Sequence, residues 1–154
     1  MKQQRYTGKG IGVALLDTGI YPHMDFDDRI TGFCDFISHK KQIYDDNGHG
    51  TCVAGILGGS GAASYGKYKG VAPECTLVAL KVLDRFGNGN KENVLKAFRW
   101  ILDHRKEYHI RVVNISVGTT YRTRNDHDVL VEGVEKLWDE GLVVVAAAGN
   151  QGPE

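Results

Sequence analysis

The chain has 154 residues, of which 42% are hydrophobic and 25% are charged, as is ordinary for one soluble globular domain. Its formal net charge is zero, which argues against nucleic acid or an anionic membrane surface as a partner. No apolar run approaches the length of a membrane-spanning helix.

The start of the chain and its cysteines bear on the cellular compartment. Residues 1–6 are not followed by an apolar segment, so we expect no signal peptide. Cys34, Cys52 and Cys75 cannot all pair with one another, and they lack the spacing of metal ligands. We therefore expect free, buried thiols, which favour a reducing compartment such as the cytoplasm and leave the localisation open.

Strand-like and helix-like patterns alternate along the chain. Residues 11–16 form a nearly continuous apolar run, typical of a strand covered on both faces. Further strands are predicted at 29–37, 76–83, 112–117 and 142–148, and helices at 51–57, 90–107 and 126–140, with Asn90 as an N-cap. The alternation predicts an α/β fold with a parallel sheet and helices on both faces, in a single domain over 1–154.

Three polar residues stand beside elements that are predicted to be buried. Asp17 follows the first strand, His49 precedes the first helix, and Asn150 follows the last strand. Because the carboxyl ends of parallel strands meet at one edge of a sheet, we expect these side chains to converge. An aspartate that orients a histidine, a histidine that accepts a proton and an amide that donates to an oxyanion together serve acyl transfer.

His49 lies between Gly48 and Gly50, where a glycine turn leads into a helix of small residues. The positive end of the helix dipole favours the neutral imidazole, which is the form that acts as a general base. This stretch alone fits an exposed, helix-capping histidine equally well, and the two distant polar residues favour the catalytic interpretation.

Five segments resemble the catalytic domain of subtilisin-like serine proteases, the subtilases. The matching segments are Val13–Ile20, Gly48–Gly55, Gly70–Pro73, Val113–Gly118 and Val143–Asn150. The resemblance implies a subtilisin-like fold and a serine endopeptidase that hydrolyses polypeptides by acyl transfer. It implies that Asp17 is the triad aspartate, His49 the general base and Asn150 the side-chain oxyanion donor.

The resemblance also implies where an extended polypeptide substrate binds. The strand that lines the specificity pocket would be Ser116, Val117 and Gly118. The edge segment that pairs with substrate would be Gly87, Asn88 and Gly89.

The chain departs from the family pattern at its nucleophile. The family's serine lies in a Gly-Thr-Ser motif beyond the oxyanion asparagine, and none of Ser38, Ser60, Ser64 and Ser116 has that context. We therefore expect the N-terminal portion of a catalytic domain, with a sheet that is incomplete on its C-terminal side. Such a chain would be inactive alone, and its partner would be the missing C-terminal part of the same domain. A second departure is Cys52, a cysteine close to His49.

Calcium is the one cofactor that the resemblance raises. Asp25 falls where the family often has a calcium-binding carboxylate, with partner oxygens from the loop at 58–70. Lys67 and Lys69 in this loop oppose a strongly anionic site, so we assign no metal ligands.

Other interpretations remain open on the sequence alone. A gene product of this length would be a catalytically silent, protease-like binding module. Residues 14–19 also resemble the active-site strand of aspartic proteases, which are all-β dimers that the helical patterns do not fit. A nucleotide-binding α/β module would need a glycine-rich turn after the first strand, whereas Gly8 and Gly10 precede it.

Overall fold

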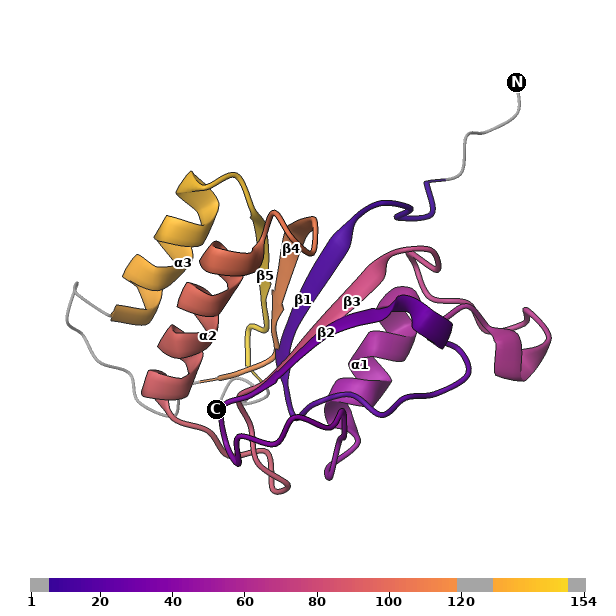
Figure 1. Cartoon of the computed structure of the whole chain (residues 1–154), viewed down its shortest axis with the longest axis horizontal. Coiled ribbons are helices and arrows are strands. Elements are labelled where there is room, and N and C mark those ends of the chain that lie inside the picture. Colours follow the sequence, from indigo (N-terminus) through magenta and orange to yellow (C-terminus); the bar gives the residue numbers. More distant parts are fainter. Residues whose placement is uncertain (1–5, 119–128, 150–154) are drawn as a thin grey trace, which may run out of the picture.

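The computed structural model describes residues 6–118 and 129–149. These residues form a five-stranded sheet in the order β2-β3-β1-β4-β5, and every neighbouring pair of strands is parallel (Figure 1). The strands are β1 Gly12–Asp17, β2 Ile30–Asp35, β3 Thr76–Lys81, β4 Ile110–Ile115 and β5 Val143–Ala146. The predicted parallel α/β fold is confirmed, and the all-β alternative is wrong because helices connect these strands.

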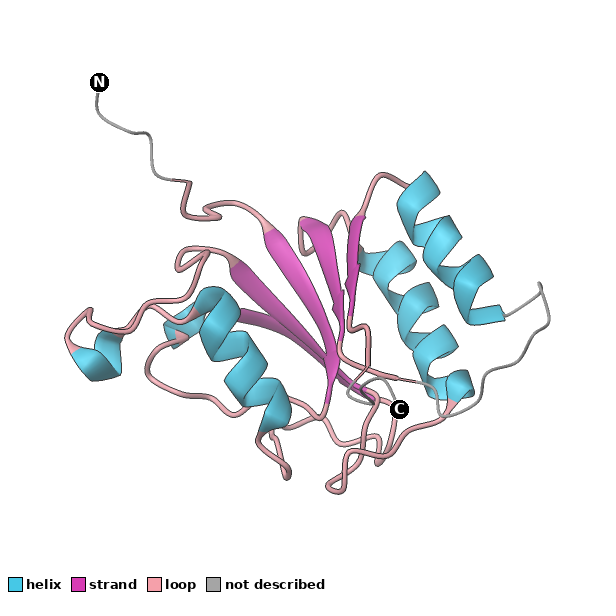
Figure 2. Cartoon of the chain, turned by 180° about the vertical axis from the view of Figure 1, so that it is seen from behind, coloured by secondary structure: helices cyan, strands magenta, loops and turns pink. Residues whose placement is uncertain are grey.

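Helices cover both faces of the sheet. The α-helices are α1 His49–Gly58, α2 Lys91–His104 and α3 Val129–Asp139, and two short 3-10 helices are η1 Asp27–Arg29 and η2 Ala62–Ser64. α1 lies on one face, while α2 and α3 lie side by side on the other (Figures 1 and 2). No helix within 6–118 or 129–149 is long and apolar enough to cross a membrane.

The central strand β1 supplies both cores, because all six of its residues are buried. Val13 and Leu15 face the core under α1, and Ala14 and Leu16 face the core under α2. Alternation of side chains along a strand produces this division, and coverage on both faces explains the unbroken apolar run in the sequence.

The helices follow their sequence signals closely. The side chain of Asn90 caps α2 by accepting a hydrogen bond from the Asn93 amide at 2.8 Å, as predicted. In α1 the buried positions are Gly50, Ala54 and Gly58, one turn apart. A Cβ atom at Gly58 would lie only 2.9 Å from Cys75 Sγ, so small residues allow this helix to sit against the sheet.

Two side chains are more exposed than their residue types suggest. Trp138 is 64% exposed, because its neighbour Leu137 takes the inward position on α3. Cys52 is exposed, because it lies two residues, or about 200° of helical turn, from the buried Gly50 and Ala54. All three cysteines are free.

Candidate active site

A carboxylate and an imidazole are hydrogen-bonded to each other at the carboxyl end of β1. His49 Nδ1 lies 2.8 Å from Asp17 Oδ1, and the imidazole donates because an ionised carboxylate only accepts. The side chain of Asp17 is 1% exposed and that of His49 is 56% exposed. The carboxylate is therefore held inside the fold, and the other ring nitrogen, Nε2, has no hydrogen-bond partner among the described residues.

Asp17 is oriented by its own surroundings. Its Oδ1 also accepts the Thr18 amide at 2.7 Å, so one oxygen receives both bonds. Its Oδ2 is buried and has no hydrogen-bond partner within 6–118 or 129–149. The arrangement is that of a fixed acid which orients a histidine and stabilises its protonated form.

Glycines place His49 at the first position of α1. Gly48 has a φ of 101°, a left-handed conformation that allows the chain to turn sharply into the helix. A Cβ atom at Gly50 would lie 2.2 Å from the carbonyl oxygen of Gly19, so only glycine permits this approach of α1 to the end of β1. The Gly50 amide completes the contact by donating to Thr18 Oγ1 at 2.9 Å.

The carboxylate of Asp45 holds the turn before His49. Its Oδ1 accepts hydrogen bonds from the Thr18 hydroxyl and from the Asn47 and Gly48 amides, at 2.9 to 3.1 Å. Its Oδ2 accepts from the amide and the hydroxyl of Thr51, at 2.9 and 2.5 Å. Burial raises the pKa of Asp45, but the hydrogen bonds from Thr51, Gly48 and Asn47 outweigh it and lower the pKa to about 2.

A fully buried lysine, Lys81, lies at the end of β3, beside Asp17 in the sheet. Its ammonium group donates to the Thr18 carbonyl, to Asp46 Oδ1 and to the Leu83 carbonyl. The ring of Tyr44 lies 5.0 Å from Nζ, and its hydroxyl donates to Asp35 Oδ2 at 2.8 Å. Burial, followed by the hydrogen bond to Asp35, raises the pKa of Tyr44 to about 12.

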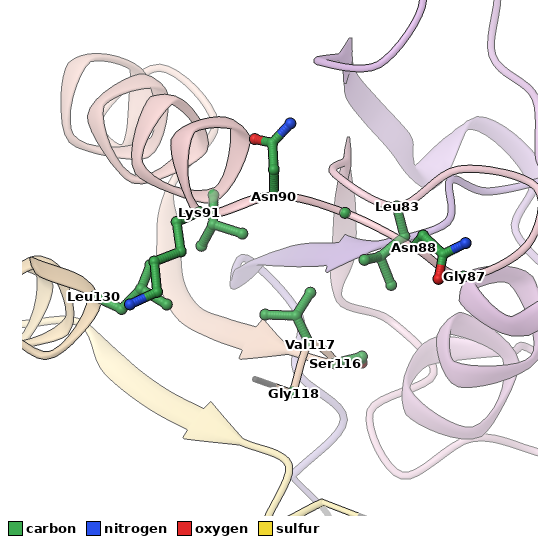
Figure 3. Close-up of a pocket in the computed structure, with 11 residues that line it drawn as sticks. Leu83, Gly87, Asn88, Asn90, Lys91, Ser116, Val117, Gly118 and Leu130 are labelled. Atoms are coloured by element: carbon green, nitrogen blue, oxygen red, sulfur yellow. The ribbon is translucent and has the colours of Figure 1, made fainter. Parts of the chain in front are cut away.

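A pocket of about 530 Å³ opens between the segment after β3 and the segment after β4 (Figure 3). All six residues predicted to bind substrate line it: Gly87, Asn88, Gly89, Ser116, Val117 and Gly118. Apolar side chains of Leu83, Val94 and Leu130 complete much of the wall.

Both walls of the pocket are tied to the backbone of β1. The Ser116 amide donates to the Leu16 carbonyl at 3.2 Å, and the Leu83 amide donates to the Asp17 carbonyl at 3.2 Å. Pocket and acid–base pair therefore share one strand end, as expected for the carboxyl edge of a parallel sheet.

The structure bears only partly on the other predicted site residues. Asn150 lies outside the described residues. Ser116 Oγ accepts a hydrogen bond from the Asn114 side chain at 2.9 Å, and no serine among the described residues is hydrogen-bonded to His49.

Asp25, where the resemblance raises a calcium-binding carboxylate, is hydrogen-bonded to its own surroundings. Asp25 Oδ1 accepts the Ala63 amide at 2.7 Å, and the guanidinium group of Arg29 donates to the Asp25 carbonyl. The part of the chain that the structure describes contains no group of three or more His, Cys, Asp or Glu side chains placed to hold a metal ion.

Sequence reasoning missed two residues of this site, Asp45 and Lys81. Asp45 stands beside Asp46 in a polar segment, and no local pattern distinguishes it from a solvated loop acid. A signal for Lys81 was present, because it is a single charged residue inside the apolar run at 76–83.

Comparison with known proteins agrees with this geometry. The model of the subtilase family matches residues 8–154. The chain is 44% identical to Serine protease AprX of Bacillus subtilis (strain 168), over 98% of the chain and 35% of that protein. It is 40% identical to Minor extracellular protease Epr of the same strain, over 95% of the chain and 21% of that protein.

A solved structure gives the same result for the fold. The crystal structure of a cold adapted subtilisin-like serine proteinase aligns with a TM-score of 0.78 and 28% identity, over 97% of this chain and 50% of that one. The chain thus spans about a third or less of the two Bacillus relatives and half of the structural neighbour. Because the family model matches residues 8–154, nearly the whole of this chain, the chain belongs to the subtilase family.

Proposed function

We propose that this chain supplies the aspartate and the general base of a subtilisin-type serine endopeptidase. The observation that carries the proposal is the 2.8 Å hydrogen bond between buried Asp17 and solvent-facing His49. The relatives named above, Serine protease AprX and Minor extracellular protease Epr, support the reaction class.

In this mechanism His49 moves one proton in two steps. Nε2 accepts the proton of a serine hydroxyl as that oxygen attacks the peptide carbonyl, and then gives it to the leaving amine. Asp17 receives the Nδ1 hydrogen bond throughout, which keeps the ring in the tautomer with a free Nε2 and stabilises the imidazolium form.

The serine comes from outside these 154 residues in this proposal, because none of the chain's own serines has the required sequence context. Asn150 donates its side-chain amide to the oxyanion that forms on the carbonyl. A polypeptide made of these 154 residues alone would then lack the nucleophile, and we expect it to hydrolyse no peptide.

The substrate is an extended polypeptide that lies between the two pocket walls. Backbone groups of Gly87–Gly89 on one side and of Ser116–Gly118 on the other would pair with it as neighbouring strands. The apolar lining from Leu83, Val94 and Leu130 favours an apolar substrate side chain in the pocket.

The test is hydrolysis of a peptide substrate by the protease that carries this sequence together with its serine. His49→Ala should remove nearly all activity, and Asn150→Ala should lower kcat by about two to three orders of magnitude with little change in KM. The matched control is His39→Asn, because His39 is exposed and its φ of 57° suits asparagine.

Inhibitors provide a second test of the same mechanism. A serine-directed sulfonyl fluoride should inactivate the protease, and a carboxylate-directed inhibitor of aspartic proteases should not. Full activity of His49→Ala, or inhibition by the carboxylate-directed reagent alone, would contradict the proposed mechanism.

A further inference from the structure

The ammonium group of Lys81 is buried and fully satisfied. The side chain is 1% exposed, and an ammonium group has three N–H donors. Each donor has an acceptor: the Thr18 carbonyl at 2.5 Å, Asp46 Oδ1 at 2.7 Å and the Leu83 carbonyl at 2.9 Å. Burial of an unpaired charge would be very costly, so these three acceptors must stay in place around the nitrogen.

The three acceptors belong to the three segments that form the candidate active site. Thr18 directly follows Asp17, and Asp46 lies three residues before His49. Leu83 lines the pocket and leads into its Gly87–Gly89 wall. One nitrogen atom thus joins the strand of the acid, the turn of the base and one wall of the pocket.

Stability alone is a weak reason for a charge at this place. An apolar side chain of similar volume commonly stabilises a core as well as a buried ion pair does, because the ion pair must first be desolvated. A satisfied ammonium group instead has directional bonds, which fix the distance between its three acceptors. Such bonds matter most where a small displacement lowers the reaction rate. A misplacement of 1 Å between reacting groups can lower the rate of an enzyme about 100-fold.

We propose that Lys81 is a positioning residue for peptide hydrolysis, a role that rests on the function proposed above. Lys81 sets the distance and orientation between Asp17, His49 and the substrate-binding wall. It touches neither the substrate nor the reacting atoms in this proposal. Its effect passes through Thr18, Asp46 and Leu83.

A matched control, Arg29, lies at the N-terminal ends of the strands, opposite the candidate active site. Arg29 also joins three segments, because its guanidinium group donates to the carbonyls of Asp25, Gly58 and Cys75. Gly58 ends α1 and Cys75 directly precedes β3, away from His49, and Asp25 lies just before η1. Loss of Arg29 should therefore destabilise the fold without disturbing the acid–base pair.

The experiment compares Lys81→Met with Arg29→Met in the serine-containing protease. We measure the unfolding midpoint, kcat and KM, with the assays run at the same temperature interval below each midpoint. Lys81→Met should lower kcat by about 10- to 100-fold with KM changed far less, and Arg29→Met should leave both constants near wild type. Equal losses of kcat in the two variants, or a wild-type kcat in Lys81→Met, would overturn the proposal.

A spectroscopic measurement separates this proposal from the proposed function. The proton that His49 Nδ1 donates to Asp17 should give a deshielded ¹H NMR signal, and its detection requires no hydrolysis. Lys81→Met should shift or broaden this signal, and Arg29→Met should leave it unchanged. If the wild-type protease hydrolyses no peptide, the proposed function fails, and an unchanged NMR signal in Lys81→Met would still overturn the positioning role by itself.

If Lys81→Met does not fold, a less disruptive variant tests the positioning role. Asp46→Ala removes one acceptor, from a side chain that is 42% exposed, and leaves Lys81 its two carbonyl partners. It should fold and should lower kcat several-fold with the same change in the NMR signal. A wild-type kcat together with a wild-type signal in Asp46→Ala would overturn the proposal.

Discussion

Gly50 determines how closely the residue that carries the imidazole approaches the strand that carries the carboxylate. A methyl group at this position would lie 2.2 Å from the Gly19 carbonyl oxygen and 3.2 Å from the side chain of Asp17. No rotamer change can relieve a clash between a Cβ atom and a backbone oxygen, so the N-terminus of α1 would have to move.

Gly50→Ala should therefore lower kcat by roughly 100-fold, because the Asp17–His49 distance would increase. The unfolding free energy should fall by about 1–3 kcal/mol. Both are measured on the serine-containing protease, by steady-state kinetics and by denaturant unfolding.

The control is Gly55→Ala in the same helix, where a Cβ atom would meet nothing within 4 Å. This substitution should keep kcat and raise the unfolding free energy by roughly 0.5–1 kcal/mol, since alanine loses less backbone entropy than glycine in a helix. Equal kinetics for the two variants would show that the contact between Gly50 and Gly19 does not set the site.

The turn at 45–48 is the element that presents His49, and a single carboxylate organises it. All five hydrogen bonds to Asp45 come from donors on Thr18, Asn47, Gly48 and Thr51. An asparagine at this position would direct an NH₂ group at backbone N–H donors. The negative charge of Asp45 also stabilises this turn, because these donors hold the pKa of Asp45 at about 2, below its ordinary value of 3.8.

The pH dependence follows from the sign of this shift. A carboxylate with a lowered pKa in the folded state stabilises the fold above its unfolded pKa, and this contribution is lost as the pH falls through the folded pKa. Partial exposure to solvent limits the contribution of Asp45 to about 1–2 kcal/mol.

We therefore expect Asp45→Asn to lower the unfolding free energy by about 1–2 kcal/mol at pH 7, and the difference from wild type to narrow between pH 4 and pH 2. Urea unfolding of both proteins at pH 7, 4 and 2.5 measures this. A difference that stays constant over this range would show that the carboxylate charge contributes nothing.

The β5 end of the sheet exposes several apolar side chains. Val143 and Val145 on β5 are 52% and 50% exposed, and Trp138 on α3 is 64% exposed. β5 lies at the end of the strand order and pairs only with β4 among the described strands. An edge strand of this kind presents unpaired backbone groups to other chains.

The isolated 154-residue polypeptide should therefore self-associate as its concentration rises. Sedimentation velocity over a concentration series measures this, and Val145→Lys should reduce association because a charge on an edge strand opposes pairing. Val71→Lys is the matched control, since Val71 is 83% exposed but lies in the segment between α1 and β3. A monomer at every concentration would contradict the expectation.

The order and type of the main elements, the parallel α/β fold and the pairing of Asp17 with His49 could all be predicted from the amino-acid sequence. These features depend on local signals: apolar runs, helical spacing, capping residues and short motifs around single polar residues. The two segments predicted to bind substrate each occupy consecutive positions in a family motif, and the structure places them as the two walls of one pocket.

The hydrogen bonds that hold Asp17 and His49 in place join segments far apart in the sequence, and they could be identified only in the folded structure. The five bonds to Asp45 and the three bonds from Lys81 join segments that are as much as 63 residues apart, as between Thr18 and Lys81. Whether a charged residue inside an apolar run finds partners depends on which loops fold over it, and no local pattern contains that information. Trp138 is exposed for the same reason, because the side of a helix that faces the sheet is set by packing rather than by the hydrophobicity of one residue.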